Sequence, residues 1–275
     1  MPSTTGNNLS NGDKQKYKFK PAQHLPLTEK CQHYTNRADV PLELQKYWAQ
    51  RYTIFSSYDD GVAMTDDAWF GVTPEPVALQ IAWEMNDISK EKTTIIDIFA
   101  GAGGNSIPFA LSERWSRVIS IEKDRDTLAC AQNNASIYGV TDQITWVLGD
   151  SFKYLSLALT NPASLDPSLR IDPETTVIFA SPPWGGPGYT TDEVFNLHEM
   201  EPYNLSQLHE ACKAMDHALF LPRSSDLRQI AKLMPAGKKA EVVQYCVEGA
   251  SKAMVAYIPA ESSSKATFYY HTGDD

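Results

Sequence analysis

The sequence predicts an α/β fold: a seven-stranded, mostly parallel sheet covered by helices on both faces, with a small helical extension before it. From residue 93 onward, short runs rich in Ile and Val alternate with segments of helical periodicity. Such alternation is typical of parallel strands joined by crossover helices. Strands are predicted at 94–99, 117–122, 144–148, 175–180 and 216–221, with a closing hairpin at 240–248 and 252–259. Helices are predicted at 105–114, 124–138, 204–214 and 224–234, and a loop at 156–174.

The residues before this domain divide into a leader and the helical extension. Residues 1–28 are poor in large apolar side chains and rich in Ser, Thr, Asn, Gly and Lys, which favours disorder. Their lysines indicate either a nuclear-import or RNA-contact tract or a solubilising tail. Residues 29–92 form the extension, in which Thr73 is the expected N-cap of a helix with Pro74 at its first position. Residues 93–275 form the sheet domain.

Composition and charge restrict the classes of protein to be considered. The 275 residues are 42% hydrophobic and 21% charged, as in a globular chain of one large domain or a domain with an appendage. A net charge of −10 argues against extended, non-specific binding to nucleic acid, which needs a broad basic face. The four cysteines show no CxxC spacing and the six histidines no pattern, so no metal site is predicted. Without an 18-residue apolar run or a signal-peptide core, a cytosolic or nuclear protein is expected.

Acidic residues stand at the ends of the first three predicted strands of the domain. Asp97 precedes a glycine-rich turn that runs from Gly101 to Asn105, Glu122 ends the second strand, and Asp150 follows the third. Glycines let the backbone approach a ligand closely, but an acid before the turn suits a cationic group better than a pyrophosphate. Glu122 can accept both ribose hydroxyls and Asp150 an adenine amino group. These five residues therefore predict a site for S-adenosylmethionine, although the glycine turn alone would also fit a purely structural role.

The segment from Ser181 to Tyr189, SPPWGGPGY, follows an apolar run and is the most informative part of the chain. Two prolines remove backbone donors and fix φ, which leaves a stiff corner rich in carbonyl oxygens. Such a corner can accept hydrogen bonds from an NH2 group, while the adjacent tryptophan can stack on a flat ring. We therefore expect Ser181, Pro182 and Trp184 to be the catalytic group, acting on an exocyclic amine of a nucleobase. The alternative for Trp184 is an ordinary core tryptophan.

Three further segments accompany the strand-end acids and the corner: Lys46–Tyr52 and Trp69–Glu75 in the extension, and Phe220–Arg223 at the end of a later strand. Together with Asp97–Asn105 and Ser181–Tyr189, they make the chain resemble the trimethylguanosine synthase family from about Gln45 to its C-terminus. The resemblance implies a class I, Rossmann-like methyltransferase fold and two successive methyl transfers to the 2-amino group of a 7-methylguanosine cap. The substrates it implies are small nuclear and small nucleolar RNAs, and it implies no metal. Glu122 stands where the family usually has Asp, and Ser224 stands where the family commonly has Asn after its leucine-proline-arginine motif.

The resemblance also assigns residues outside the two motifs. It implies that Lys46, Asn134 and Arg223 contact the cap triphosphate, and that Phe55 and Thr73 line the cofactor pocket. The sequence itself leaves two alternatives open for Thr73, since it could do no more than cap its helix. Tyr189 and Tyr203 could line the pocket or simply pack.

The expected mechanism is positioning, because the lone pair of a guanine 2-amino group is delocalised into the ring. Holding donor and acceptor about 3–3.5 Å apart supplies roughly 7–11 kcal/mol. A 7-methylguanine ring is cationic, so stacking on Trp184 adds a cation–π contact of about 2 kcal/mol.

Two other functions remain open: methylation of an internal guanine or adenine of RNA, and a non-catalytic cap-binding adaptor. Ribonucleoprotein core proteins are candidate partners. We expect a monomer without membrane contact. Its expected location is the nucleus, in the nucleolus or a Cajal-body-like compartment, with the cytoplasm as a further site.

Overall fold

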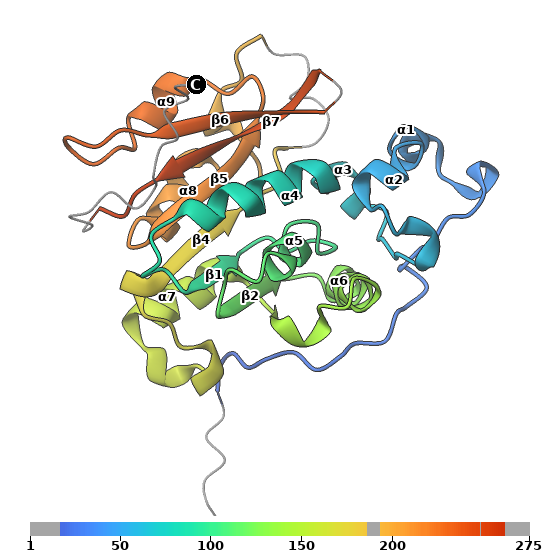
Figure 1. Ribbon diagram of the computed structural model, residues 1–275, viewed down its shortest axis with the longest axis horizontal. Helices are drawn as coiled ribbons and strands as arrows, with labels where there is room; N and C mark the ends of the chain where they lie inside the picture. Colours follow the sequence, from blue (N-terminus) through green and yellow to red (C-terminus); the bar gives the residue numbers. More distant parts are fainter. Residues whose placement is uncertain (1–16, 186–192, 248, 262–275) are drawn as a thin grey trace, which may run out of the picture.

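The computed structural model describes residues 17–185, 193–247 and 249–261, and it has the expected α/β architecture (Figure 1). Its seven-stranded sheet has the order β3-β2-β1-β4-β5-β7-β6. The strands β1 to β5 pair in parallel, and β7 runs antiparallel to both β5 and β6. The strands are β1 Thr94–Asp97, β2 Arg117–Glu122, β3 Ile144–Leu148, β4 Thr176–Ala180, β5 Asp216–Pro222, β6 Glu241–Val247 and β7 Ala250–Ile258.

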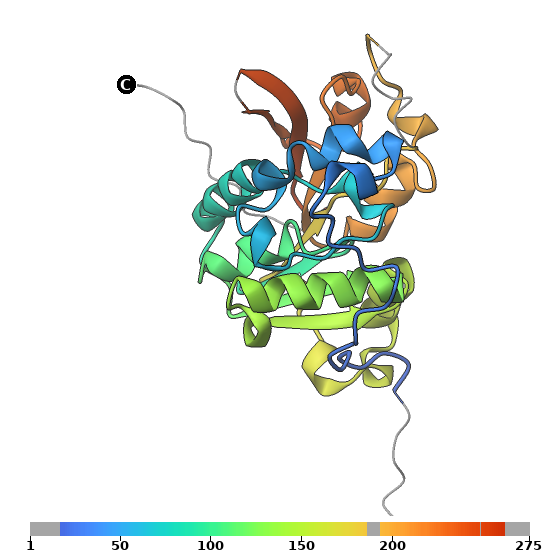
Figure 2. The same ribbon diagram turned by 90° about the vertical axis from the view of Figure 1, so that its right-hand side faces the viewer.

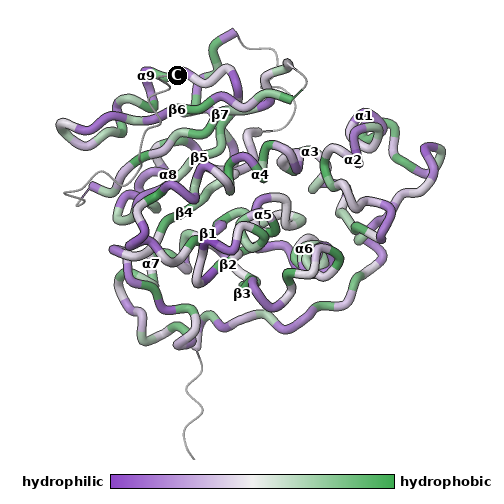
Figure 3. The backbone as a smooth tube through the Cα atoms, viewed as in Figure 1, coloured by the Kyte–Doolittle hydropathy of each residue, from purple (hydrophilic) through white to green (hydrophobic). Residues whose placement is uncertain are grey.

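Helices cover both faces of the sheet, as predicted. Neighbouring residues of a strand point to opposite faces, so Ile95 packs into the core under α4, α5 and α6 while Ile96 packs into the core under α7, α8 and α9. Figure 3 shows hydrophobic residues along the strands in the middle of the molecule. The helices are α4 Glu75–Glu84, α5 Ser106–Leu111, α6 Arg125–Ile137, α7 Ser151–Thr160, α8 Leu205–Cys212 and α9 Leu227–Ala231.

The predicted loop over 156–174 is wrong in its first part. Helix α7 continues to Thr160, and the remainder contains three short 3-10 turns. Asp150 caps α7 by accepting a hydrogen bond from the Lys153 backbone N–H at 2.9 Å. Within the wrongly predicted part, Ala158 is buried beside Leu155 of the same helix, and the first proline, Pro162, comes only after the helix has ended. Packing therefore extends the helix up to the proline-containing part of the segment.

The extension before the sheet consists of short helices, as predicted, and leads into α4. Thr73 is not the N-cap of that helix: α4 begins at Glu75, and Pro74 is its capping residue without a side-chain hydrogen bond. Within the described ranges, every helix is too short or too polar to cross a membrane. The shorter helices of the extension are α1 Gln45–Trp48, α2 Arg51–Ile54 and α3 Ala68–Gly71.

Residues 17–32, here called the strap, run along the outside of β3 and α6 to the extension (Figures 1 and 2). The expected disorder of residues 1–28 is therefore wrong for residues 17–28, and residues 1–16 lie outside the described part. The strap is held by backbone hydrogen bonds and by one buried aromatic ring rather than by a run of apolar residues, which is why composition suggested disorder. These contacts are Lys18 N to Ser164 O, Ala22 N to Trp146 O, Asp166 N to Phe19 O, and the ring of Phe19 on Tyr154.

Candidate active site

Four of the predicted site residues, Asp97, Glu122, Asp150 and Ser181, lie at or just after the carboxyl ends of β1, β2, β3 and β4. The strands that follow β1 in the chain, β2 and β3, are added on one side of it, and the strands that follow β4 are added on the other side. Ligands of open α/β sheets bind at such a switch point. Asp97 ends β1 beside Phe179 of β4, so the loops that carry the acidic residue and Ser181 leave the sheet side by side. The sequence predicted this grouping because each residue directly follows its strand.

Asp97 is a buried carboxylate without a positive partner. Its side chain is fully buried and accepts hydrogen bonds from the Ser106 hydroxyl at 2.7 Å and the Phe99 backbone N–H at 3.2 Å. None of the ion pairs among the described residues includes Asp97. Burial raises the pKa of Asp97 to about 6, although these hydrogen bonds oppose the rise. Such a carboxylate is suited to bind the ammonium group of an amino-acid moiety.

The glycine turn and Glu122 form one hydrogen-bonded unit. Gly101 has φ +53°, a left-handed conformation, and its N–H donates to Glu122 Oε2 at 3.0 Å. The other carboxylate oxygen accepts from the Asp124 N–H at 2.8 Å. Burial raises the pKa of Glu122 above its usual range. Each oxygen keeps a lone pair, so Glu122 has the capacity to accept two ribose hydroxyls.

Asp150 is exposed, and its helix lies beside an aromatic cluster in which Tyr203 is joined by Phe99 and Phe152, two residues that were not predicted to belong to the site. The ring of Tyr203 is tilted by 33° against that of Phe152, with centroids 4.5 Å apart, and its centroid lies 5.8 Å from that of Phe99. Phe99 and Phe152 follow strand-end acids by two positions, which is the pattern that could have identified them. Tyr203 therefore packs within the site, whereas Tyr189 lies outside the described residues.

The corner after β4 is joined to the glycine turn through Asn105. The Ser181 hydroxyl donates to the Phe99 carbonyl at 3.4 Å and accepts from Asn105 Nδ2 at 3.4 Å. Asn105 Nδ2 also donates to Thr73 Oγ1 at 2.9 Å. Pro182 is buried behind Ser181. The structure thus brings Thr73, Asn105 and Ser181 together, from segments far apart in the sequence.

Trp184 is half-buried, and its orientation is fixed. Its Nε1–H donates to the Phe220 carbonyl at 3.2 Å, and its ring stacks on that of Phe220 at 5.6 Å between centroids and 23° between planes. Phe220 belongs to β5, which ends just before Arg223. Arg223 is exposed, and its guanidinium donates to the Ser251 carbonyl at 3.4 Å.

The three remaining predicted residues lie in different surroundings: Lys46 is exposed, whereas Phe55 and Asn134 are buried. Lys46 is exposed in α1, with its ammonium 4.7 Å from the centroid of the Tyr47 ring. Phe55 is buried next to Tyr138, 6.2 Å between ring centroids, at the edge of a small apolar hollow. The cofactor role of Phe55 and the substrate role of Lys46 therefore stay predictions.

The substrate role expected for Asn134 is corrected by its position. Asn134 is fully buried in α6. Its Oδ1 accepts from the Ala63 N–H at 2.9 Å, and its Nδ2 donates to the carbonyls of Ala63 and Ala102, both at 3.0 Å. With both amide hydrogens used, it has no donor left for a phosphate. Asn134 instead connects the extension to the glycine turn.

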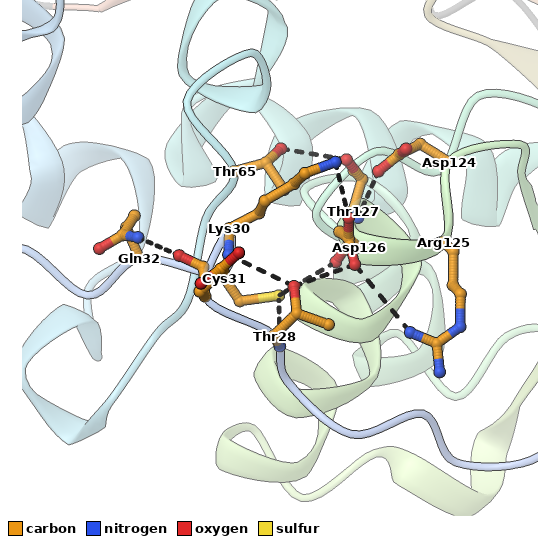
Figure 4. Close-up of polar contacts among 10 residues, drawn as sticks. Thr28, Lys30, Cys31, Gln32, Thr65, Asp124, Arg125, Asp126 and Thr127 are labelled. Carbon is orange, nitrogen blue, oxygen red and sulfur yellow. Dashed lines mark hydrogen bonds and ion pairs between the residues drawn. The ribbon is translucent and has the colours of Figure 1, made fainter.

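The strap is anchored on the first turn of α6, directly after Glu122 (Figure 4). Asp126 accepts a hydrogen bond from the Thr28 hydroxyl at 3.0 Å and pairs with the Lys30 ammonium at 3.3 Å. The Asp124 carboxylate caps the same turn through the Thr127 N–H at 2.8 Å. The strap therefore braces the loop that carries the expected ribose ligand.

The described residues contain no group of three or more His, Cys, Asp or Glu side chains that could hold a metal ion. The groups that the site does present are carboxylates at strand ends, a glycine turn, and a corner of hydroxyl and carbonyl acceptors. These groups can bind a cationic methyl donor on one side of the switch point and an amine on the other.

Comparisons with known proteins agree with this geometry. A family model described as RNA cap guanine-N2 methyltransferase matches residues 92–261. Trimethylguanosine synthase of Schizosaccharomyces pombe is 36% identical over 224 residues, which are 79% of this chain and 87% of that protein. Its Saccharomyces cerevisiae counterpart is 33% identical over 206 residues, 72% of this chain and 62% of that protein. The solved structure of human methyltransferase 10 domain containing protein has a TM-score of 0.51 and 15% identity, covering 80% of this chain and 99% of that one, a likeness of fold alone.

Proposed function

The chain belongs to the RNA cap guanine-N2 methyltransferase family, and from that premise we propose that it methylates the 2-amino group of a 7-methylguanosine cap twice. The observation that carries the proposal is the corner at Ser181. It lies beside the buried, unpaired Asp97, so an amine acceptor and a carboxylate suited to the ammonium end of a methyl donor meet at one switch point.

S-adenosylmethionine, when bound, supplies a methyl group on a sulfonium sulfur. Asp97 would hold its ammonium group and Glu122 its ribose hydroxyls. In the first transfer, Ser181 Oγ and the Pro182 carbonyl accept hydrogen bonds from the two N–H groups of the guanine amine; in the second, one of them accepts from the single N–H that remains. In both cases the nitrogen lone pair is directed at the methyl group. The amine nitrogen would gain the methyl group that the sulfonium sulfur loses, and it would then release a proton to water.

Trp184 explains the preference for a cap that already carries the N7 methyl group. The ring of Phe220 and the hydrogen bond to the Phe220 carbonyl hold the indole in a fixed orientation, against which the purine would stack. A desolvated cation–π contact of about 2 kcal/mol corresponds to roughly thirtyfold preference over uncharged guanine. Arg223 and Lys46 are exposed and are the candidate contacts of the triphosphate.

We further infer that the capped substrates are small nuclear and small nucleolar RNAs, modified in the nucleus and also in the cytoplasm, with ribonucleoprotein core proteins as partners of a monomeric enzyme. The description of the matching family supports a cap substrate, and the choice among capped RNAs is our extension of it.

The experiment compares labelled methyl transfer from S-adenosylmethionine to 7-methylguanosine triphosphate and to GTP. We expect labelling of the first only, with products carrying one and then two added methyl groups by mass spectrometry. Trp184→Ala should lower kcat/KM for the cap analogue about thirtyfold. Trp83→Ala, an exposed tryptophan on α4, is the matched control.

Three results would contradict the proposal. Labelling of GTP as strong as that of 7-methylguanosine triphosphate would show that Trp184 does not select the N7-methylated base. Labelling of an internal guanine or adenine of an RNA, without labelling of the cap analogue, would favour the internal amino-methyltransferase. Cap binding without any transfer would identify an adaptor.

A further inference from the structure

Asn105 occupies the point where the extension, the glycine turn and the corner meet. It is 5% exposed, and its amide nitrogen lies 2.9 Å from Thr73 Oγ1 and 3.4 Å from Ser181 Oγ. An amide nitrogen has two hydrogens and accepts none, so both hydrogens are directed at hydroxyl oxygens. Its own carbonyl oxygen, Oδ1, is buried without a hydrogen-bond partner among the described residues.

The Ser181 hydroxyl is restricted by its two neighbours. A hydroxyl has one hydrogen and two lone pairs. The hydrogen is directed at the Phe99 carbonyl, 3.4 Å away, and one lone pair receives the Asn105 amide. The group that faces a substrate is then the remaining lone pair, so Ser181 acts towards it as an acceptor.

This restriction matters for transfer to an amine. A hydroxyl that is free to rotate could donate its hydrogen to the amine nitrogen and engage the lone pair that must attack the methyl group. A hydroxyl held as an acceptor binds an N–H instead and leaves that lone pair available. We propose that Asn105, itself held by Thr73, is a positioning residue that fixes the Ser181 hydroxyl as an acceptor for the substrate amine.

The proposal rests on the proposed amine methylation and adds a separate role to it. The proposal replaces the cofactor role that the sequence predicted for Asn105. Its amide nitrogen is directed at Thr73 Oγ1 and Ser181 Oγ, so in this proposal Asn105 acts through Ser181. Its effect should therefore appear in kcat, should depend on the presence of Ser181, and should leave the affinity for S-adenosylhomocysteine nearly unchanged.

The test is a double-mutant cycle of Asn105→Asp and Ser181→Ala, measured with 7-methylguanosine triphosphate. Asp has the shape of Asn but cannot donate at this position. We expect Asn105→Asp to lower kcat about 10–100-fold, the usual cost of losing a partner that orients a reacting group. In the Ser181→Ala background the same change should cost less than about twofold, because residues acting through one contact are not additive.

A second pair of variants separates orientation from folding. Thr73→Val removes the oxygen that holds Asn105 at nearly constant volume, and Thr73→Ser retains it. We expect kcat to fall in the Val variant and to stay within about twofold of wild type in the Ser variant, with the two unfolding temperatures close together.

The inference would be overturned by full activity of Asn105→Asp, by additive losses in the cycle, or by a calorimetric affinity for S-adenosylhomocysteine that falls as much as kcat. Failure of the proposed substrate is distinguishable. If wild type labels GTP or an internal guanine instead, the cap assignment is wrong, and the same cycle on the accepted substrate still decides the role of Asn105.

Discussion

Replacing Asp97 by Asn should make the free protein more stable while it abolishes cofactor binding. The carboxylate is fully buried, and burial raises its pKa to about 6. At pH 7.5 the Asp97 carboxylate is therefore charged although its burial destabilises the charged form. The ammonium of a bound cofactor would offset this cost, but the free protein bears it fully.

The size of the effect follows from the pKa. A rise of about two pKa units corresponds to about 3 kcal/mol against the charged form. Asn has only one oxygen, so it loses one of the two hydrogen bonds that the side chain accepts from Ser106 and Phe99, at about 1 kcal/mol. The net gain of about 2 kcal/mol should raise the unfolding temperature by about 4–8 °C.

Thermal unfolding of wild type and Asp97→Asn without ligand, between pH 5 and pH 8, measures this gain. The pKa of Asp97 is higher in the folded protein than in the unfolded chain. The buried charge therefore takes nothing from the free energy of unfolding at low pH and lowers it by the full amount above about pH 6. The advantage of the variant should thus shrink as pH falls from about 6 towards 4. Calorimetric titration with S-adenosylhomocysteine should give no measurable binding. A variant less stable than wild type at pH 7.5, or an advantage that does not change with pH, would refute this account of the buried charge.

Three further outcomes are expected. The dissociation constant of wild type for S-adenosylhomocysteine should rise about tenfold per pH unit below about pH 6, because Asp97 is protonated there and must lose the proton before it can pair with the ammonium; a flat calorimetric profile would argue against that pairing. Gly149→Ala should lower the free energy of unfolding by about 1–3 kcal/mol in urea titration, because the added Cβ overlaps the ring of Phe19, and Phe19→Ala should relieve most of the added strain. In fluorescence titrations, Arg223→Ala should weaken binding of 7-methylguanosine triphosphate but not of 7-methylguanosine. Asn134→Ala should instead lower the stability of the protein, and it should leave the difference in affinity between these two ligands as in wild type.

Much of the site could be predicted because its residues directly follow strands. The strands of a parallel sheet end at one edge. A residue such as Asp97 or Glu122 is therefore placed by the position of its strand in the sequence. The corner at Ser181 is also local, since its prolines act on the backbone beside them.

The failures share a cause in contacts between distant segments. Thr73 was expected to cap its own helix, but it accepts a hydrogen bond from Asn105, 32 positions away. Asn134 was matched to phosphate binding, yet it is sealed between the extension and the glycine turn. Residues 17–28 have the composition of a disordered segment, but they are held by a backbone hydrogen bond to β3 and by the side chains of Gln132 and Asp126 of α6.

The sequence by itself determined the fold class, the acidic strand ends and the amine-accepting corner, because each depends on residues close together in the chain. Only the tertiary structure decided how these parts are connected. It set the Ser181 hydroxyl between Asn105 and Phe99, buried Asp97 without a cation, and placed Trp184 against Phe220. The physical reason is that hydrogen bonding, desolvation and stacking depend on distances through space, which the order of residues along the chain does not specify.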